Sequence, residues 1–340
     1  MGNCSSSRSK IMRKQMDSTM SEHDGIKSVK VDDHNCDFSR NSNLCICIIT
    51  WNMNGKVCYQ DLVELVGSNR KFDLLVVGFQ EAPRENIARL LQTVLLDTHK
   101  LVRKVTMQSL QLYVFGPLNS GSFIKEMKVD KHAVGGLGGL IRRTKGAVAI
   151  YINYKGIPIV FISCHLSAHA RNVEERNRQC RHISRKLFSR KWNPYAKPAQ
   201  IIVWLGDLNY RIQGIDTYQA RSLIQHDLQT LLTGKDQLLQ EAERGQVFNG
   251  YSEGILTFKP TYKYNIGTGN AYDTSYKVRV PSWTDRILFK IDDVDKITAT
   301  LHSYDSIDDI YSSDHKPVKA HLCFNFLNDQ QAKTVNSDIN

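Results

Sequence analysis

Residues 201–209 read IIVWLGDLN, a short apolar run that ends in Asp207 and Asn209. A run of this length is typical of a buried β-strand, and we predict a strand at residues 201–205. Four other predicted strands also have polar side chains at one end: Asn52 after 44–51, Glu81 after 73–80, His165 at the end of 157–165, and Asp314 with His315 before 318–324. Open α/β folds bind ligands at strand ends, so we expect these side chains to converge on one site.

The residue types in this set narrow the chemistry. Carboxylate and amide oxygens suit Mg²⁺, which keeps coordination positions for a substrate phosphate. The eight cysteines lack the paired spacing of a zinc site, so we expect an intracellular chain whose cysteines, Cys45 and Cys47 included, are reduced thiols. No G-x-S-x-G or Cys-x5-Arg segment marks a nucleophilic serine or cysteine. We therefore predict that water attacks a phosphate polarised by Mg²⁺ directly.

Apolar segments of strand and helix length alternate between residues 44 and 326. Further strands are predicted at 112–115, 146–154 and 286–291, and helices at 59–66, 85–96, 173–189, 216–225 and 235–243. Strand-rich halves with covering helices favour a layered α/β sandwich. Residues 1–42 are rich in Ser, Lys, Asp and Asn and are predicted to be disordered, and 327–340 are predicted to be a polar tail. Residues 43–326 are therefore predicted to be one domain.

The chain is basic, with 45 Lys and Arg against 34 Asp and Glu and a formal charge of +11. A basic surface suits phosphate-rich ligands, so charge alone leaves nucleic acid, anionic membranes and inositol phosphates as alternatives. No apolar run reaches the roughly 20 residues that a membrane-spanning helix needs.

The first residues, MGNCSS, match the N-myristoylation pattern with Gly2 as the acceptor. One myristoyl chain binds a membrane only weakly, so stable anchoring needs a second signal. Cys4 supplies a palmitoylation site, and basic residues between positions 8 and 14 add attraction to anionic lipid. We expect the chain to be anchored at the cytoplasmic face of a membrane, with the plasma membrane preferred.

Two motifs give a specific resemblance. WLGDLNYR at 204–211 and PSWTDRIL at 281–288 are similar to the signature motifs of the inositol polyphosphate 5-phosphatases. Five supporting motifs follow the family order: TWNMNG at 50–55, GFQEAP at 78–83, HLSAH at 165–169, KPTYKYN at 259–265 and SSDHKPV at 312–318. The resemblance covers about 44–326, and the compact length resembles a small plant-type member. It implies a catalytic domain with the DNase I-like fold of the endonuclease, exonuclease and phosphatase superfamily: an α/β four-layer sandwich of two mixed β-sheets flanked by helices.

The resemblance implies roles for the polar strand ends. Glu81 and Asn52 would hold Mg²⁺. Asp207 would orient or deprotonate the attacking water, and Asn209 would position the water and the phosphoryl oxygens.

The remaining strand-end residues would bind the transferring phosphate. His315 would hydrogen-bond it as charge develops, and Asp285 would fix the orientation of His315. His165 would contact the phosphate from the other side, and Asp314 would lie near the metal. An ion pair between Asp285 and its neighbour Arg286 is the structural alternative for Asp285.

The segment 259–279 favours an inositol ring over nucleic acid. Lys263, Tyr264, Lys277 and Arg279 match positions at which the family grips the phosphate next to the scissile one, and their charges and hydroxyl suit that task. Arg211 is a further candidate for substrate binding. We expect a monomer that binds phosphoinositide headgroups and an anionic membrane surface, and no nucleic acid.

The preferred function is Mg²⁺-dependent hydrolysis of the 5-phosphate from phosphoinositides such as phosphatidylinositol 4,5-bisphosphate. A phosphatase acting on soluble inositol trisphosphate is the first alternative, since both substrates share a headgroup. A nuclease of the same fold and a non-enzymatic membrane-binding module are less favoured. Thr284 departs from the family pattern, because it replaces the usual Cys of the second signature motif.

Overall fold

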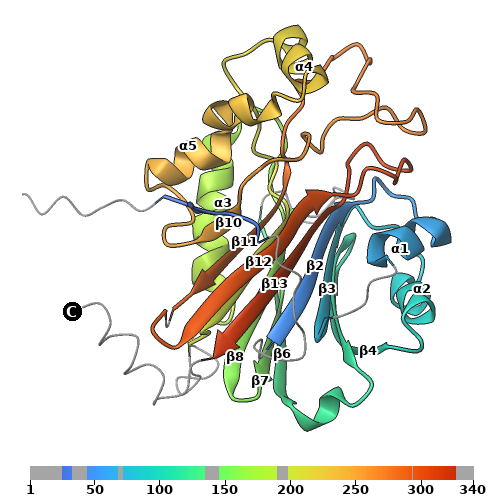
Figure 1. Ribbon diagram of the computed structural model, residues 1–340, viewed down its shortest axis with the longest axis vertical. Helices are drawn as coiled ribbons and strands as arrows, with labels where there is room; N and C mark the ends of the chain where they lie inside the picture. Colours follow the sequence, from blue (N-terminus) through green and yellow to red (C-terminus); the bar gives the residue numbers. More distant parts are fainter. Residues whose placement is uncertain are drawn as a thin grey trace, which may run out of the picture.

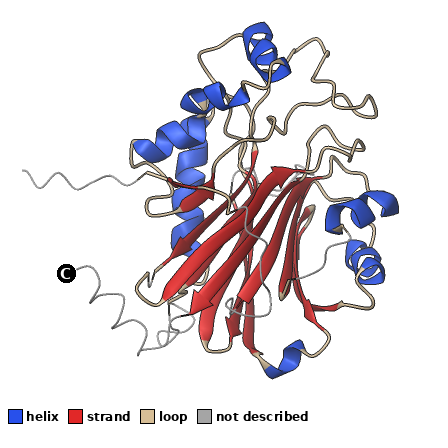
Figure 2. Ribbon diagram, viewed as in Figure 1, coloured by secondary structure: helices blue, strands red, loops and turns tan. Residues whose placement is uncertain are grey.

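The structure is a computed structural model that describes residues 25–32, 44–67, 72–134, 145–189, 198–292 and 294–326. Two β-sheets pack face to face, with helices on their outer sides and α4 beyond one end of the strands (Figure 1 and Figure 2). The helices are α1 (Tyr59–Val66), α2 (Ile87–Val94), α3 (Val173–Lys186), α4 (Thr217–Gln225) and α5 (Gln237–Glu243), with 3₁₀ turns at Ser120–Ser122 and Gln229–Lys235.

Both sheets contain parallel and antiparallel strand pairs. The seven-stranded sheet has the order β1 (Lys27–Val29), β10 (Ser252–Gly254), β11 (Asp285–Ile291), β9 (Ile201–Asp207), β8 (Ile157–His165), β7 (Gly146–Tyr154) and β6 (Ile124–Ala133). The six-stranded sheet has the order β12 (Ile297–Ser306), β13 (Val318–Phe326), β2 (Leu44–Asn52), β3 (Leu74–Gln80), β5 (Leu110–Pro117) and β4 (His99–Met107).

Three apolar layers hold the sandwich together. Between the sheets, alternate residues of the central strands pack against one another, such as Ile48 of β2 and Val203 of β9. The residues between them on β2 and β3 face outward and pack on α1 and α2. On the other side, Trp204 of β9 packs with Ile183 of α3. Two sheets with a helical layer on each outer side confirm the predicted four-layer α/β sandwich.

The predicted strands and helices are all present, with ends shifted by a few residues. The strands that sequence analysis missed include β4, β6 and β12, which all lie at sheet edges. Their sequences mix apolar and charged residues, as in IKEMKVDKHA of β6, and most of their side chains are partly or fully exposed. Charged edge strands are common because they block pairing with other molecules, and they leave no continuous apolar run in the sequence.

The predicted disorder of residues 1–42 is wrong for Lys27–Val29. These residues form β1, which pairs in parallel with Ser252–Gly254 of β10. Val29 packs on the inter-sheet layer, so this short strand gains its order from a long-range contact that its own composition does not indicate.

The expectation of reduced thiols is wrong for one pair of cysteines. Cys45 of β2 and Cys323 of β13 are direct partners in the antiparallel register and are joined by a disulfide. Cys47, Cys164 and Cys180 are buried free thiols, as expected for core cysteines.

The two sheets approach each other closely at Gly78 of β3. A Cβ atom there would lie 2.7 Å from Ser163 Oγ and 2.8 Å from Leu205 Cδ1 on the opposite sheet. We expect Gly78→Ala to lower the free energy of unfolding by about 1–3 kcal/mol through overpacking, measured by urea denaturation. Gly121→Ala is the control, since a Cβ there meets nothing within 4 Å. Equal stability of the two variants would contradict the close approach.

Candidate active site

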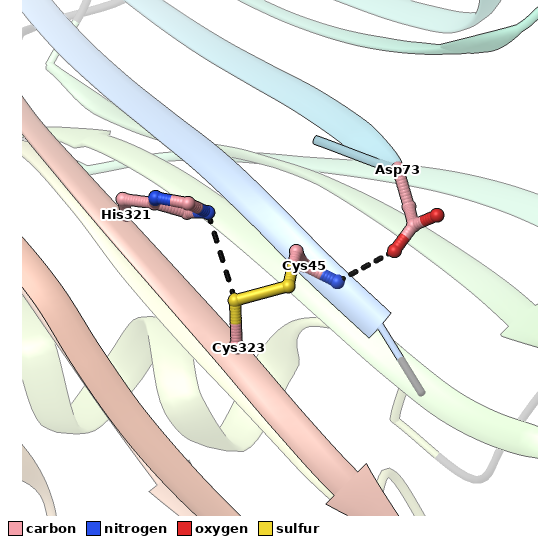
Figure 3. Close-up of a disulfide and its surroundings, with 4 residues drawn as sticks. All are labelled: Cys45, Asp73, His321 and Cys323. Atoms are coloured by element: carbon pink, nitrogen blue, oxygen red, sulfur yellow. Dashed lines mark hydrogen bonds between the residues drawn. A yellow bond between two sulfur atoms is a disulfide. The ribbon is translucent and has the colours of Figure 1, made fainter. Parts of the chain in front are cut away.

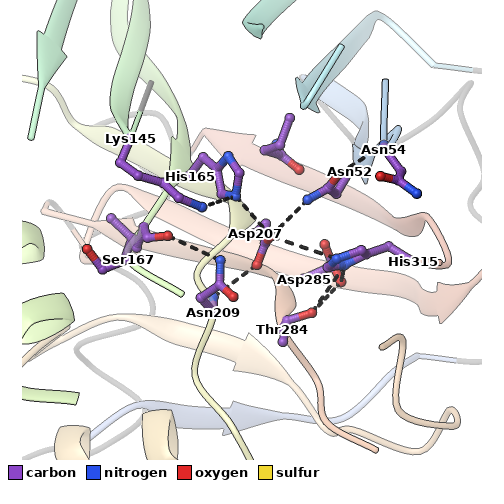
Figure 4. Close-up of polar contacts among 12 residues, drawn as sticks. Asn52, Asn54, Lys145, His165, Ser167, Asp207, Asn209, Thr284, Asp285 and His315 are labelled. Atoms are coloured by element: carbon purple, nitrogen blue, oxygen red, sulfur yellow. Dashed lines mark hydrogen bonds and ion pairs between the residues drawn. The ribbon is translucent and has the colours of Figure 1, made fainter. Parts of the chain in front are cut away.

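The polar strand ends predicted from the sequence meet at one edge of the sandwich (Figure 4). The parallel pairs β2 with β3 and β8 with β9 all end at this edge. The strands β11 and β13 begin there, because they run antiparallel to β9 and β2. The segment before β13 is held by hydrogen bonds from Ser313 Oγ to the Asn52 carbonyl and from Trp51 Nε1 to the His315 carbonyl.

A polar layer separates the apolar core from the site. Gln80 Nε2 donates to Thr50 Oγ1 at 3.2 Å and lies 3.4 Å from Ser163 Oγ. These residues continue the inward-facing stripes of β2, β3 and β8, and they satisfy one another's hydrogen bonds inside the sandwich. The next inward positions along the strands are those of the site residues, such as Asn52 and His165.

Asp207 is the most connected side chain of the site. Its Oδ2 accepts a hydrogen bond from Asn52 Nδ2 at 3.0 Å and lies 3.2 Å from His165 Nε2. Its Oδ1 accepts from the backbone NH of Asn209 at 3.1 Å. Asp207 is 1% exposed, so these contacts replace nearly all of its hydration.

The surrounding charges keep Asp207 ionised. Burial alone would raise the pKa of Asp207, but the hydrogen bond from His165 and the charges of His315 and Lys145 hold it well below its usual range. Burial and the adjacent Lys145 ammonium lower the pKa of His165, so this imidazole is neutral at pH 7. Lys145, which sequence analysis left without a role, contacts the His165 ring directly.

Asp285 pairs with His315 rather than with Arg286. Its Oδ2 lies 2.9 Å from His315 Nδ1, whereas Arg286 forms buried ion pairs with Asp236 and Glu253. The ion-pair alternative for Asp285 is therefore wrong.

Two threonines also hold Asp285. The hydroxyls of Thr261 and Thr284 donate to its Oδ2 at 2.7 and 2.8 Å. Thr284 stands where the family motif has Cys, and its hydroxyl strengthens the anchoring of the carboxylate. Sequence analysis gave neither threonine a role, and the departure at position 284 was the signal that could have found one of them.

The pairing with Asp285 keeps the imidazole of His315 charged in the site. Burial by itself would lower the pKa of His315, but the nearby carboxylates of Asp285, Asp207 and Asp314 raise it to about 9. His315 Nε2 lies 4.0 Å from Asp207 Oδ2, a gap that an oxygen atom of water or phosphate can bridge with about 2.8 Å to each side.

The residues predicted to hold a metal fit a hard divalent cation. Asn52 of β2 is the register partner of Gln80 of β3, and Glu81 is the next residue after Gln80. Asn52 Oδ1 accepts one hydrogen bond from the Asn54 NH. An amide oxygen has a second lone pair, which leaves it free to bind a cation as well. Both donors are oxygens, which is the set that Mg²⁺ and Ca²⁺ prefer. The Asp314 carboxylate, also predicted to lie near the metal, pairs with Lys263 Nζ at 3.5 Å.

Two of the predicted site residues adopt a strained backbone conformation. Glu81 has φ of 49° and Asn209 has φ of 58°, in the left-handed region that non-glycine residues rarely occupy. His169, beside the site, has φ of 74°. Such conformations persist where the surrounding structure fixes them, and they cluster at functional sites.

A basic pocket of about 270 Å³ adjoins the site. Arg211, Tyr262, Lys277 and Arg279 are among its lining residues. The Arg211 guanidinium stacks over the Tyr262 ring, 4.2 Å from its centroid, and the Tyr262 ring lies 4.5 Å from that of His315. Three of the predicted substrate-binding residues therefore converge beside the catalytic histidine candidate, with an aromatic ring that connects them to it.

Lys263 and Tyr264 occupy different positions from this group. Lys263 Nζ lies 3.5 Å from Asp314 Oδ2, at the border between the pocket and the strand ends. Tyr264 is 4% exposed, and its hydroxyl donates to Tyr272 on the far side of the segment. The prediction that Tyr264 faces the substrate is wrong in this structure, and Tyr262 is the tyrosine that lines the pocket.

The two predicted lipidation sites, Gly2 and Cys4, lie outside the described residues. Within the described part of the chain, no helix has the length and apolar character of a membrane span.

Comparison with known proteins identifies the family of this chain. Residues 49–321 match the model of the Endonuclease/Exonuclease/phosphatase family 2. The chain is 62% identical to the type IV inositol polyphosphate 5-phosphatase 11 of Arabidopsis thaliana over 91% of this chain and 90% of that protein. It is 30% identical to the human phosphatidylinositol 4,5-bisphosphate 5-phosphatase A over 83% of this chain, which corresponds to 31% of that longer protein.

A solved structure matches with a TM-score of 0.70 and 30% identity, over 87% of this chain and 89% of that one. It is the inositol polyphosphate 5-phosphatase domain of a synaptojanin in complex with inositol (1,4)-bisphosphate and calcium ion. This match confirms the predicted DNase I-like fold. Together with the Arabidopsis relative, it shows that the chain belongs to the inositol polyphosphate 5-phosphatase family and is a phosphoric monoester hydrolase.

Proposed function

We propose that this enzyme removes the 5-phosphate from membrane phosphoinositides such as phosphatidylinositol 4,5-bisphosphate in a Mg²⁺-dependent reaction with water as the nucleophile. The observation that carries the proposal is the arrangement of Asp207 opposite the His315–Asp285 pair, with a basic pocket beside them. The gap between Asp207 and His315 suits a water molecule and the phosphoryl group that it attacks. The basic pocket suits a neighbouring phosphate on the same ring.

Each residue has a task that its contacts support. Asp207, fixed by Asn52 and Asn209, accepts a hydrogen bond from the attacking water and so orients it toward phosphorus. The charged His315, held by Asp285, donates from Nε2 to a phosphoryl oxygen as negative charge develops there. The neutral His165 and the adjacent Lys145 ammonium contact the phosphate from the β8 side.

A cation held by Asn52 and Glu81 would supply charge neutralisation at the phosphoryl oxygens. The protein's part is to present oxygen donors from two adjacent strand ends in a fixed direction. Mg²⁺ is preferred because the donor set is small and leaves positions for water and phosphate. The calcium ion bound in the complex of the synaptojanin domain supports a hard divalent cation in this family.

The substrate assignment rests on the basic pocket. Lys277, Arg279 and Arg211 provide charge for a phosphate next to the scissile one, and Tyr262 provides a hydroxyl and an aromatic face. Burial and the charges of Arg279, Arg171, Arg211 and Lys277 lower the pKa of His169, which reflects how strongly positive this region is. A pocket of this size suits an inositol ring with its phosphates better than a continuous nucleic-acid strand.

The first experiment compares substrates directly. The purified 340-residue chain is given lipid vesicles with phosphatidylinositol 4,5-bisphosphate, soluble inositol 1,4,5-trisphosphate and duplex DNA, each with Mg²⁺ and with EDTA. We expect Mg²⁺-dependent phosphate release, fastest from the lipid, and intact DNA. Asp207→Asn and His315→Ala are expected to lower kcat by roughly 10²–10⁴-fold with folding preserved, because each loses a contact made to the reacting groups.

Three outcomes of this experiment are decisive. Full activity in EDTA would refute the metal requirement. Faster release from the soluble trisphosphate would favour the alternative substrate. Near-native activity of both variants would overturn the residue roles.

The pH dependence tests the His315 assignment. A pKa raised to about 9 means that His315 is protonated below that pH and loses its phosphate-binding proton as pH rises through it. We expect kcat to fall on the alkaline side, and Asp285→Asn to move this fall to lower pH by about one unit or more, measured in a profile from about pH 6 to pH 10. Asp305→Asn, at an exposed position of β12, is the control. An unchanged alkaline limb in Asp285→Asn would contradict the assignment.

The two tyrosines provide a matched pair for the pocket. Tyr262→Phe is expected to raise KM for substrates with a phosphate next to the scissile one by roughly 10–150-fold, since a hydrogen bond to a charged group contributes about 1.5–3 kcal/mol after desolvation. Tyr264→Phe is expected to leave KM unchanged, because its hydroxyl contacts only Tyr272 among the contacts described for it. The reverse pattern would restore the original assignment of Tyr264.

We also propose that the enzyme is held at the cytoplasmic face of the plasma membrane by myristoylation of Gly2 and palmitoylation of Cys4. The MGNCSS start and the basic residues that follow it support this proposal. Gly2→Ala is expected to shift the protein from the membrane to the soluble fraction of a cell lysate, with activity on soluble substrate unchanged. Membrane association that persists in this variant would point to another anchor.

A further inference from the structure

A second cluster of reactive side chains lies at the opposite end of the six-stranded sheet from the active site. Cys45 lies near the start of β2, and Cys323 and His321 lie two residues apart on β13 (Figure 3). Cys45 is seven residues before Asn52, which separates the cluster from the active site by about 23 Å along the strand. The established reaction of the family therefore does not use it.

The register brings these three side chains together on one face. Cys45 exchanges hydrogen bonds with Asp73 on the β3 side: its NH donates to Asp73 Oδ2 and its carbonyl accepts from the Asp73 NH. Cys45 and Cys323 are therefore a non-hydrogen-bonded pair, the type in which opposed side chains lie closest, and their Cα atoms are 4.1 Å apart. His321 points to the same face because strand side chains alternate.

The spacing matches that of a thiolate and imidazole metal site. One sulfur or nitrogen atom from each of Cys45, Cys323 and His321 lies within 4.8 Å of the others. Zn–S bonds of about 2.3 Å and Zn–N bonds of about 2.0–2.1 Å at a tetrahedral angle put sulfur and nitrogen about 3.6 Å apart. The distance from Cys323 Sγ to His321 Nε2 is 3.6 Å. The sulfur atoms, now bonded to each other, would need to separate.

We propose that, in the reduced chain, Cys45, Cys323 and His321 bind one thiophilic divalent cation, with Zn²⁺ preferred, and that the disulfide is the metal-free oxidised form of the same site. A site with two sulfurs and one imidazole nitrogen as donors binds Zn²⁺ in preference to Mg²⁺. This set differs from the oxygen donors at the active site, so the two sites select different cations.

A fourth donor lies beside the cluster. The ring of His302 on β12 is 5.4 Å from that of His321, and its Nδ1 is buried without a hydrogen-bond partner among the described residues. A tetrahedral site needs four ligands; a water molecule would complete it, or His302 if its ring moved toward the cluster. Burial, with the charges of His302 and Lys319, lowers the pKa of His321 to about 4, so its ring is in the neutral form that binds metals.

A phosphine reductant converts the oxidised disulfide form to the reduced dithiol form. A phosphine takes an oxygen atom from water and delivers two electrons, which converts the Cys45–Cys323 disulfide to two thiols. Zn²⁺ then displaces the two thiol protons, so each bound cation releases two protons at neutral pH. Oxidation of the thiolates by a disulfide compound reverses the process and releases the cation.

The test compares the reduced and oxidised forms of the full chain. Both are stripped of metal, kept in excess Mg²⁺ to occupy oxygen-donor sites, and titrated with ZnCl₂ or CoCl₂. The phosphine reductant is present only with the reduced form. We expect the reduced form to bind one more equivalent of Zn²⁺ per chain than the oxidised form, and its Co²⁺ complex to show a sulfur-to-metal charge-transfer band. Equal metal content in the two forms would overturn the proposal.

Variants identify the ligands. Cys323→Ser and His321→Asn are expected to weaken Zn²⁺ binding by more than about 100-fold, because loss of a ligand costs more than loss of an outer hydrogen bond to one. Cys58→Ser changes an exposed free thiol elsewhere and is expected to bind as the unmodified chain does. His321→Asn keeps the disulfide, so its folding is checked in the oxidised form if Cys323→Ser fails to fold. A charge-transfer band that survives in His321→Asn at unchanged affinity would exclude His321 as a ligand, and loss of the band in Cys58→Ser would refute the site.

Discussion

The register of β8, β9 and β11 is the constraint on which the active site depends. His165 is the register partner of Asp207 in the parallel pair, and Asp285 is its partner in the antiparallel pair. The three side chains therefore stand in one row across neighbouring strands and point to the same face of the sheet. A shift of one residue in either pairing would turn His165 or Asp285 to the opposite face and dismantle the row.

This row places two carboxylates close together in a dry environment, which is unfavourable unless positive groups compensate. His165 and Lys145 lie beside Asp207, and His315 lies between Asp207 and Asp285. The attraction between the Asp207 carboxylate and the His315 imidazolium lowers the pKa of Asp207 and raises that of His315. A substitution of either residue therefore changes the pKa of the other. The hydroxyls of Thr261 and Thr284 satisfy Asp285 further and leave the imidazole as its main charged partner.

The six-stranded sheet connects two chemically different ends. β2 carries Asn52 at one end and Cys45 at the other, and β13 follows His315 and carries Cys323 near its own end. Oxygen donors collect where the inter-sheet layer opens, and sulfur and imidazole donors collect on the outer face near the first and last residues of the domain. The disulfide there joins two cysteines that are 278 residues apart in sequence, on the two strands β2 and β13 that also lead to the active site.

The buried strands, the polar residues at their ends, the chemistry of those residues and the family could all be predicted from the amino-acid sequence. This was possible because central strands are continuous apolar runs and because the signature motifs are local. The face that each strand turns to the site could not be predicted in this way, since strands buried on both sides, such as β2, show no alternation to read.

Long-range pairing in the folded chain set the remaining features. The partner of Asp285, the choice of Tyr262 over Tyr264, the order of β1 and the bond between Cys45 and Cys323 all depend on which distant segments lie side by side. The segment with the tyrosines forms only isolated bridges and no regular strand, so its sequence carries no periodicity that shows which ring faces the pocket. Contacts between residues far apart in the chain arise from the sheet register, which a single sequence does not reveal.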